Sequence, residues 1–547
     1  MDLKKQIKQF KGEIATDEKT LAVFSTDASL YRVKPQAVAF PKDSQDIKDL
    51  VKFVVEQNQN GASLSLTPRA AGTDMSGGPL TESIVVSMTK YFNRVKKIGR
   101  DFAEVEAGAY YRDFEKQTLA RGLLLPSYPA SKELCTVGGM VANNSGGELN
   151  LIYGKTERYI ESLKMVLRDS KEYIFSPLTL EELAKKKQGS GLDAQIYSQL
   201  FDLIDKNYDV IMAAKPDVSK NSAGYYLWNV YDKKKGIFDL TKMIVGSQGT
   251  LGIITEIKFK LIKPLQREHL LVVFLDDLQS LPEITNHLLK FHPQSIESFD
   301  DHTFKVALRL LPEIVARLKG NALKLFFGFL PELWMAATGG IPKLVLLAEF
   351  ASHDDKDAFD RTREAQESLK EFGVRTKLIL SEADAQKYWV MRRESFNLLR
   401  HHVRGMRTAP FIDDFVVKPQ FLGEFLPRLY TLLNKYKLLY TIAGHVGDGN
   451  FHIIPLMKLN NPKAAEVIRD LGDEVYQLVL EYKGSITGEH NDGLVRSPYL
   501  EQMYGPKIYE LFIETKKIFD PGNIFNPGKK TASSQSFGQA HLDFKAQ

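Results

Sequence analysis

The first half of the chain alternates short apolar runs with longer amphipathic stretches. Apolar runs at residues 38–40, 84–88 and 103–106 are separated by stretches with the spacing of helices. Ser44 is a plausible N-cap for a helix that continues to Gln57. This interleaving of expected strands and helices indicates an α/β or α+β domain.

The pattern changes after Lys263-Pro264, where longer helical periodicities mix with an apolar strand over 344–350. We therefore divide the 547 residues into a first domain over 1–265 and a second over 266–500. A C-terminal helix and loop over 501–530 is expected to return to the first domain. Residues 531–547 contain few aliphatic side chains and are predicted to be disordered.

Composition excludes several kinds of chemistry. Cys135 is the only cysteine, so this sequence holds no internal disulfide, four-cysteine iron–sulfur cluster or Cys-ligated structural zinc. The formal net charge of +5 comes without a long basic block, so nucleic-acid binding is not expected. The charged start of the chain differs from a secretory leader, and we expect a cytoplasmic protein.

The most apolar stretch covers residues 325–342, where a glutamate, two prolines and glycines interrupt the run. These interruptions disfavour a membrane-spanning helix. We interpret the stretch as a helical insert packed on the protein, with peripheral contact at the inner face of a membrane as the alternative.

Three glycine-dense segments lie within the first 252 residues. They read TPRAAGTDMSGG at 67–78, TVGGMVANNSGG at 136–147 and GSQGTLG at 246–252. Glycine permits positive φ and lets backbone N–H groups approach a ligand closely. None of the segments fits a P-loop or a dinucleotide-binding fingerprint. Together they predict a large ligand that is held from several sides.

The segment TIAGHVGDGNFHIIPL at 441–456 predicts a hairpin with a two-residue turn at Asp448-Gly449. That register places His445 opposite His452, with Cβ atoms about 4.5–5.5 Å apart on one face. Two such imidazoles suit a shared divalent metal, and Glu489 offers an oxygen ligand beside a candidate base, His490. A hydrogen-bonded pair of partly buried imidazoles is the alternative interpretation.

Taken together, these segments resemble the vanillyl-alcohol-oxidase (PCMH-type) FAD-binding family. Residues 68–78 resemble its first FAD loop, and residues 136–147 with Tyr153-Gly154 resemble its second. Residues 220–225, 246–255 and 520–529 resemble further family stretches, in the same order. The resemblance implies an α+β fold, with a FAD-binding domain of two α/β subdomains and an α+β cap domain that contains an antiparallel sheet.

The resemblance also implies FAD, with its pyrophosphate on backbone amides of the first two loops. No histidine precedes His269, so a histidyl link at these loops is excluded, and Cys135 is expected to be a buried small hydrophobe. We therefore expect non-covalent FAD. The residues assigned to it are Pro68, Arg69, Ala70, Ala71, Gly72, Thr73, Ser76, Gly77, Thr136, Val137, Gly138, Gly139, Ala142, Asn143, Asn144, Gly146, Gly147, Tyr153, Gly249, Gly252, Ile253, Ile254 and Asn526.

The histidine segment matches the HxGDGNxH motif of the FAD-linked D-2-hydroxyacid dehydrogenases, the D-lactate dehydrogenase and glycolate oxidase subunit type. The match implies metal ligands at His445, His452 and Glu489, and a catalytic base at His490. Arg392 in the WVMR segment resembles the arginine that binds the substrate carboxylate, with Arg393 as the alternative. The metal is expected to be Zn, with Mn or Fe as alternatives.

The implied activity is oxidation of a D-2-hydroxy acid. D-lactate is the first expectation, and glycolate and D-2-hydroxyglutarate remain open. Electrons are expected to pass to an external quinone, cytochrome, electron-transfer flavoprotein or separate iron–sulfur subunit. The run GEHNDGLVRSPYL departs from the commoner GEHGxG and resembles relatives that carry an iron–sulfur half on the same polypeptide.

Two functions of other classes compete with this interpretation. The same fold supports a non-redox, FAD-dependent ether-lipid (alkylglycerone phosphate) synthase, which the metal motif disfavours. A non-catalytic electron-transfer subunit is the other, and the presence of His490 and Arg392 disfavours it.

Overall fold

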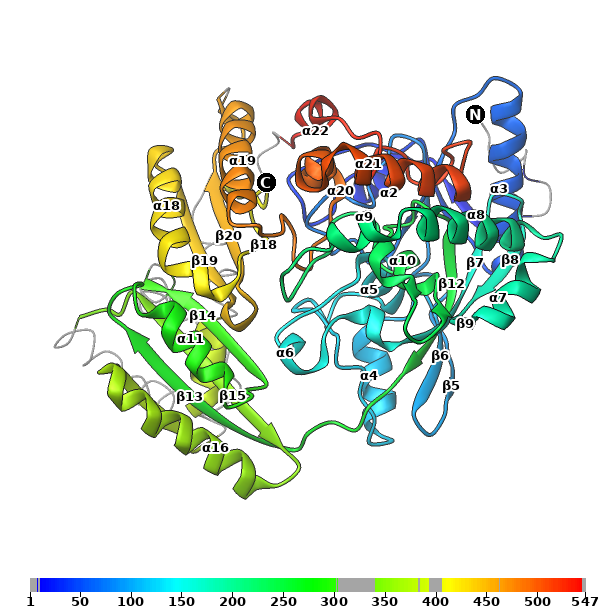
Figure 1. The fold of residues 1–547 in the computed structure, drawn as a ribbon. Coiled ribbons are helices and arrows are strands. Elements are labelled where there is room, and N and C mark those ends of the chain that lie inside the picture. Colours follow the sequence, from blue (N-terminus) through cyan, green and yellow to red (C-terminus); the bar gives the residue numbers. More distant parts are fainter. Residues whose placement is uncertain are drawn as a thin grey trace.

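A computed structural model describes residues 7, 10–301, 303, 340–381, 384–392, 406–461 and 463–543. Figure 1 shows two lobes, and the chain passes from one to the other between residues 260 and 267. Arg393 and residues 325–339 of the apolar stretch lie outside the described residues, so their interpretation stays a prediction. In the described part of the chain, no helix combines the length and apolarity needed to cross a membrane.

A four-stranded sheet opens the first lobe, in the order β1 (Glu13–Ala15), β2 (Ala37–Phe40), β4 (Ile84–Ser87) and β3 (Leu66–Arg69). Strands β2, β4 and β3 are parallel, and α3 (Ser44–Gln59) connects β2 to β3. The N-cap of α3 is Asp43 and not Ser44, because the Asp43 carboxylate accepts the backbone N–H of Asp46.

The second sheet of this lobe is antiparallel throughout. Its order is β5 (Val95–Ile98), β6 (Phe102–Glu106), β12 (Ile253–Lys260), β7 (Ile160–Val166) and β8 (Glu172–Phe175). The remaining elements of the lobe are α2 (Glu18–Phe24), α4 (Tyr111–Leu119), α5 (Val137–Asn143), α6 (Asn150–Tyr153), α7 (Leu180–Lys187), α8 (Leu192–Lys206), α9 (Tyr208–Ala213), α10 (Thr241–Ile244), β9 (Leu178–Thr179), β10 (Tyr231–Asp232) and β11 (Ile237–Phe238).

The second lobe is built on an antiparallel sheet of eight strands. Its order is β16 (Arg375–Ile379), β13 (Arg267–Leu275), β15 (Leu344–Ser352), β14 (Ser295–Asp300), β19 (Leu439–His445), β20 (Asn450–Met457) and β17 (Arg407–Thr408), and β18 (Phe415–Val416) also pairs with β20. We call this sheet the cap sheet. Helices α11 (Leu281–Leu289), α16 (Asp355–Ser368), α18 (Leu422–Lys435) and α19 (Ala464–Glu481) pack in the same core as one face of it.

Successive side chains along the strands of the cap sheet point alternately to its two faces. Leu346 and Ile296 enter the helix-covered core, whereas Leu347 and Phe299 point to the opposite face and pack with Tyr388. The candidate chemistry of the cap lies on this second face, because Glu297 is in register with Leu347 and His452 with Ala443.

After the cap, the chain returns to the first lobe through α20 (Gly493–Arg496) and α21 (Leu500–Phe519), drawn in orange and red in Figure 1. Phe512 and Phe519 of α21 are buried in the core of the first lobe. Helix α21 therefore packs against the first lobe.

The prediction of disorder after residue 530 is wrong for residues 531–543. Helix α22 (Gln535–Ala540) is followed by Leu542, which is buried and forms a β-bridge with Tyr31. The buried carboxylate of Asp543 pairs with Arg32 and Arg407. Low aliphatic content did not indicate disorder here, because ion pairs and backbone contacts hold the segment. Residues 544–547 lie outside the described part.

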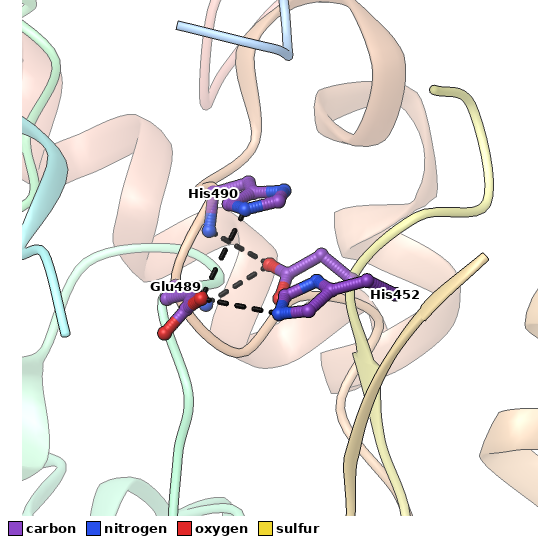
Figure 2. Close-up of side chains that lie close together, drawn as sticks. His452, Glu489 and His490 are labelled. Carbon is purple, nitrogen blue, oxygen red and sulfur yellow. Dashed lines mark hydrogen bonds and ion pairs between the residues drawn. The ribbon is translucent and has the colours of Figure 1, made fainter. Parts of the chain in front are cut away.

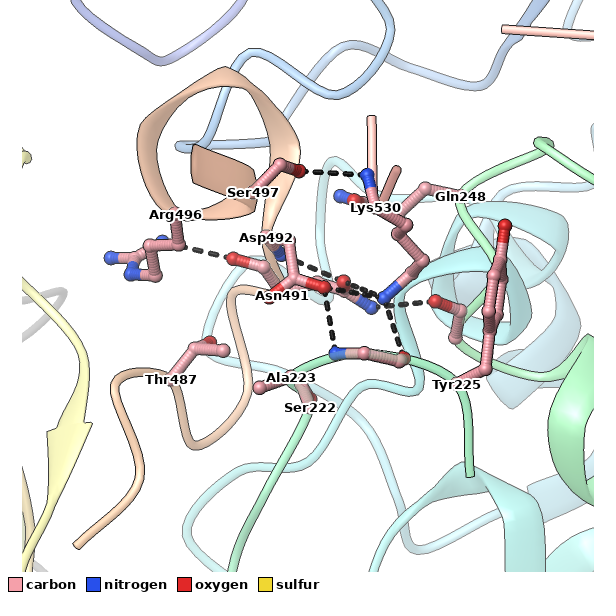
Figure 3. Close-up of polar contacts among 12 residues, drawn as sticks. Ser222, Ala223, Tyr225, Gln248, Thr487, Asn491, Asp492, Arg496, Ser497 and Lys530 are labelled. Carbon is pink, nitrogen blue, oxygen red and sulfur yellow. Dashed lines mark hydrogen bonds and ion pairs between the residues drawn. The ribbon is translucent and has the colours of Figure 1, made fainter. Parts of the chain in front are cut away.

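A buried ion pair joins three segments where the chain returns (Figure 3). Nζ of Lys530 donates to Asp492 Oδ2 at 2.7 Å, to the Gly224 carbonyl at 2.8 Å and to Asn491 Oδ1 at 2.8 Å. The side chains of Lys530 and Asp492 are both fully buried. Removing one partner of such a pair leaves an uncompensated charge in the interior.

We predict that Lys530→Met lowers the free energy of unfolding by about 3–5 kcal/mol, because Asp492 loses its buried counter-ion. Lys507→Met is the matched control, since Lys507 is exposed on α21 and should change stability by less than about 0.5 kcal/mol. Urea and thermal unfolding of both variants measure the difference. Equal midpoints would contradict the prediction.

Candidate active site

The histidine hairpin forms, but its register differs from the predicted one. His445 pairs with Asn450 and Ala443 pairs with His452, so the turn spans four residues, 446–449, and the two-residue type I′ turn is wrong. Gly449 has φ +67°, and a Cβ added at this position would lie 1.8 Å from the Val417 carbonyl oxygen. The turn therefore packs closely against the segment that contains Val417. A shift of two residues preserves side-chain direction, so both imidazoles still share one face. Their ring centroids are 5.2 Å apart.

Three imidazoles converge on one carboxylate oxygen. Nε2 of His445 lies 3.2 Å from Glu489 Oε1, Nε2 of His452 lies 3.3 Å from it, and Nε2 of His490 lies 3.9 Å from it. Figure 2 shows His452, Glu489 and His490 facing one another. The structure therefore brings the three predicted metal ligands and the predicted base together.

Lys220 holds the other oxygen of Glu489. Its Nζ lies 3.2 Å from Glu489 Oε2 and 3.5 Å from Asp448 Oδ2, and the lysine side chain is fully buried. Burial alone would raise the pKa of Glu489, but the charges of Lys220 and His445 outweigh it and hold that pKa well below its usual range. Glu489 is therefore an anion, with Oε1 directed at the imidazoles.

Asp414 fixes the loop that carries Glu489 and His490. Its Oδ2 accepts the backbone N–H groups of both residues at 2.9 and 2.7 Å, and also the Thr487 hydroxyl at 2.6 Å. Its Oδ1 accepts Asn450 Nδ2 at 3.0 Å. Asp414 lies within ligand range of the imidazoles, but these donors occupy both of its oxygens. We therefore assign it to loop support and not to metal ligation.

Asp413 orients the predicted base. Its Oδ2 lies 2.8 Å from His490 Nδ1, and its Oδ1 accepts the guanidinium of fully buried Arg496. In the neutral ring, a proton on Nδ1 would leave Nε2 of His490 as the acceptor, on the side that faces Glu489. Burial lowers the pKa of His490, but Asp414 and Asp413 outweigh it and raise that pKa to about 9. A divalent cation beside Glu489 would act in the opposite direction, by charge repulsion.

Arg392 reaches the same cluster from the helical segment 384–392 and pairs with Glu297 of β14. Oε1 of Glu297 lies 2.5 Å from His445 Nδ1. Burial alone would raise the pKa of Glu297, but Arg392 and His445 lower it to about 2. No motif marked Glu297, and its strand reads SIESFD, in which polar residues outnumber the apolar ones, so the local pattern did not indicate that this glutamate is buried.

A cavity beside this cluster encloses about 1320 Å³, part of it open to solvent. Its lining comes from all three glycine-dense segments and from the loop of Glu489 and His490, which suits an elongated ligand held from several sides. Fourteen of the predicted FAD residues line it: Pro68, Arg69, Ala70, Gly72, Thr73, Thr136, Gly138, Gly139, Ala142, Asn143, Gly146, Gly249, Gly252 and Ile254. Glu489 and His490 line it too, so the cavity and the histidine cluster are continuous.

The first glycine loop has the free donors that a pyrophosphate needs. Among the described residues, the backbone N–H groups of residues 71–75 donate no hydrogen bond within the chain, and Gly72 and Thr73 line the cavity. In the second loop, the amides of Val137, Gly138 and Gly139 already bond to Ala109, Ala107 and Thr136, whereas the Gly146 amide donates no hydrogen bond among the described residues and Gly146 lines the cavity. The cavity therefore fits FAD, with backbone amides that have no partner in both loops.

Nine predicted FAD residues do not line the cavity: Ala71, Ser76, Gly77, Val137, Asn144, Gly147, Tyr153, Ile253 and Asn526. Several of these residues support the cavity wall without facing the cavity. Asn526 donates to the carbonyl groups of Gly78 and Gln248, and Asn144 ends α5 in the left-handed region with φ 50°. The sequence analysis did not predict that residues 129–131 form part of the cavity wall. The signal available for them was a proline that precedes the glycine-rich start of a helix.

Cys135 also lines the cavity, but only 4% of it is exposed. Burial raises the pKa of its thiol to about 12. Such a thiol is a poor nucleophile. This environment supports the expectation of a non-covalent flavin.

Comparison with known families identifies both lobes. Residues 35–175 match the FAD binding domain, and residues 265–530 match the C-terminal domain of FAD linked oxidases. The two domains lie in order and meet at the cavity and the histidine cluster. The chain therefore belongs to the FAD linked oxidases, with a FAD binding domain followed by their C-terminal domain.

Three similar proteins carry related names. The chain is 28% identical to D-2-hydroxyglutarate dehydrogenase of Pseudomonas putida, over 95% of this chain and 50% of that protein. It is 25% identical to glycolate oxidase subunit GlcD of Bacillus subtilis, over 97% of each chain. It is 26% identical to D-lactate dehydrogenase of Archaeoglobus fulgidus, over 90% of each. The chain thus spans about half the length of the D-2-hydroxyglutarate dehydrogenase it matches.

Solved structures agree on the fold. The 4-ethylphenol oxidase of Gulosibacter chungangensis superposes with a TM-score of 0.68 over 96% of this chain and 95% of that chain. An alkyldihydroxyacetonephosphate synthase superposes with a TM-score of 0.63 over 94% of this chain and 82% of that chain. Both are 15% identical to this chain, so they show the PCMH-type architecture alone.

We predict that Cys135 of the native protein reacts with iodoacetamide about 10³-fold more slowly at pH 8 than in the urea-unfolded chain, because the raised pKa reduces the thiolate fraction. The native rate should still rise about tenfold per pH unit between pH 8 and 10, whereas the unfolded rate should level off. Mass spectrometry of time points measures both rates. Rapid native labelling at pH 8 would contradict the prediction.

Proposed function

We propose that the protein oxidises a D-2-hydroxy acid with FAD, and that D-lactate, giving pyruvate, is the substrate. The observation that carries the proposal is the convergence of His445, His452, Glu489 and His490 beside the cavity. FAD, when bound, supplies the two-electron acceptor for the hydrogen at C2 of the substrate.

Residues of the chain would bind the metal, remove the hydroxyl proton and bind the substrate carboxylate. His445, His452 and Glu489 would hold a divalent metal, for which Zn suits two nitrogens and one oxygen with a position left open for substrate. A metal there would favour the alkoxide form of the substrate hydroxyl. His490 would take the hydroxyl proton at Nε2, since its Nδ1 faces Asp413. Arg392 would bind the substrate carboxylate.

The wall beside the histidines favours a short substrate. On the face of the cap sheet that carries His452, the flanking side chains Ala443, Ile454 and Phe299 are all apolar. A second carboxylate placed directly against these three side chains would be desolvated, and none of the three could donate a hydrogen bond to it. This supports D-lactate over D-2-hydroxyglutarate, and glycolate remains a small alternative.

The electron acceptor is proposed to lie outside these 547 residues and to be a quinone, a cytochrome, an electron-transfer flavoprotein or a separate iron–sulfur subunit, because their one cysteine cannot ligate a cluster. The non-redox ether-lipid synthase is the competing function of another class. The solved synthase supports it through fold alone, whereas the histidine cluster supports oxidation.

The test is anaerobic mixing of the FAD-loaded protein with a panel of hydroxy acids, followed by flavin absorbance. We expect D-lactate to bleach the flavin fastest, D-2-hydroxyglutarate and glycolate to be slower, and L-lactate to have no effect. His490→Ala should slow bleaching by at least about 10²-fold and leave bound FAD unchanged, since it removes the base. A flavin that no member of the panel reduces would reject the oxidation and favour the synthase.

Asp413→Asn gives a sharper prediction. Arg496 donates to the side-chain atom that faces it, so the introduced amide must turn its oxygen to Arg496 and its NH2 to His490. His490 Nδ1 then becomes an acceptor and the proton moves to Nε2, where it blocks base catalysis. We expect flavin reduction by D-lactate to fall about 10²-fold or more in maximal rate.

Asp217→Asn is the matched control for this variant, because Asp217 is exposed and pairs only with Lys418 among the described residues. Both variants should retain FAD, and half-saturation by D-lactate should change little. Equal reduction rates for Asp413→Asn and the unmodified protein would remove the oriented base from the mechanism.

A further inference from the structure

We propose that Glu297 is a positioning residue that couples the metal site to the substrate carboxylate site. Its two oxygens contact one group from each: Oε1 lies 2.5 Å from His445 Nδ1, and Oε2 pairs with the Arg392 guanidinium. This inference rests on the proposed function, because it assigns the two sites that Glu297 joins.

The first part of the argument concerns the tautomer of His445. An imidazole binds a metal through the nitrogen that carries no proton, and a carboxylate on the other nitrogen fixes which one that is. Glu297 faces Nδ1, so Nε2 is the free atom, and Nε2 is the atom directed at Glu489. Glu297 therefore orients His445 for metal binding.

The second part concerns Arg392. Its side chain is 10% exposed, and among the described residues its Nε has no hydrogen-bond partner. A buried donor without a partner is unfavourable until a ligand supplies one. Since Glu297 pairs with one end of the guanidinium, it holds the planar group in place and leaves Nε for an incoming carboxylate.

The third part concerns rigidity. Glu297 is fully buried in the middle of β14, which pairs with β15 on one side and β19 on the other. His445 belongs to β19, so the Glu297–His445 contact is made within one sheet. A contact built on neighbouring strands positions its groups more accurately than one built on loops.

The alternative is a purely structural ion pair. A buried glutamate that served only as the counter-ion of Arg392 would need no contact with a metal ligand. The two interpretations differ in one measurable respect, since only the coupling interpretation makes the effect of Glu297 on metal affinity depend on His445.

The experiment titrates Zn²⁺ into the FAD-loaded, metal-depleted protein in competition with a chromophoric chelator. We expect Glu297→Gln to weaken Zn²⁺ binding by about 10- to 100-fold, the usual effect of losing such a partner. Glu349→Gln is the matched control. Glu349 lies on β15 of the same sheet and contacts Gln294, so this variant should bind Zn²⁺ as the unmodified protein does.

A double-mutant cycle separates coupling from structure. In a His445→Ala background, Glu297→Gln should weaken Zn²⁺ binding by no further factor, because the contact it removes is already lost. An additional loss equal to that in the unmodified background would overturn the proposal. Glu297→Asp keeps the negative charge on a shorter side chain, so it should weaken Zn²⁺ binding less than Glu297→Gln does. This variant replaces Glu297→Gln in the experiment if Glu297→Gln fails to retain FAD.

Substrate binding gives the second readout. If Glu297 also holds Arg392, Glu297→Gln should raise the D-lactate concentration for half-maximal flavin reduction by about tenfold, measured with saturating Zn²⁺. Zn²⁺ binding that is unchanged by Glu297→Gln would overturn this inference and leave the proposed function standing. Failure of the unmodified protein to bind Zn²⁺ would instead reject the metal centre and the inference together.

Discussion

Compensation of buried charge is the constraint on which the candidate site depends. Glu489, Glu297, Asp413 and Asp414 are all buried, and a carboxylate away from water is tolerated only when cations and hydrogen-bond donors surround it. Lys220, Arg392, Arg496 and the imidazoles provide that surrounding. Each carboxylate is thereby fixed in direction as well as in charge.

This constraint also explains why the site lies at the junction of the lobes. Lys220 comes from the first lobe, His445 from the cap sheet and Glu489 from the segment that returns. Lys155, another buried lysine of the first lobe, donates to the carbonyl groups of Asn221 and Gly488. Polar contacts across the junction thus hold the loop that carries the candidate base against the FAD cavity.

The sequence predicted the parts of the site that depend on local pattern. The glycine loops, the histidine hairpin and the GEH segment each have a recognisable composition, and the face shared by His445 and His452 survives a register error of two residues. The turn length itself was wrong because tertiary packing of Gly449 against Val417 decided it. Local preference for a type I′ turn carried no information about that neighbour.

Residues that act through distant partners were harder to predict. Glu297 lies in a strand without a motif, and its role appears only when β14 is placed beside β19. The tail after residue 530 was misjudged for the same reason, because Asp543 is held by Arg32 and Arg407, which lie 511 and 136 residues earlier in the chain. Ion pairs over such separations leave no periodic signal in the sequence.

The departure from GEHGxG can be explained by the same physical argument. Asn491 donates to the carbonyl groups of Asn143 and Gly246, and Asp492 accepts from Lys530 and from the Gly224 N–H. These contacts join the loop to the first lobe and, through Lys530, to the C-terminal segment (Figure 3). A buried aspartate at 492 requires a buried cation, and Lys530 supplies it. The unusual Asn-Asp pair therefore belongs to the anchoring of the chain behind the site, and the orientation of His490 still depends on Asp413 and Asp414.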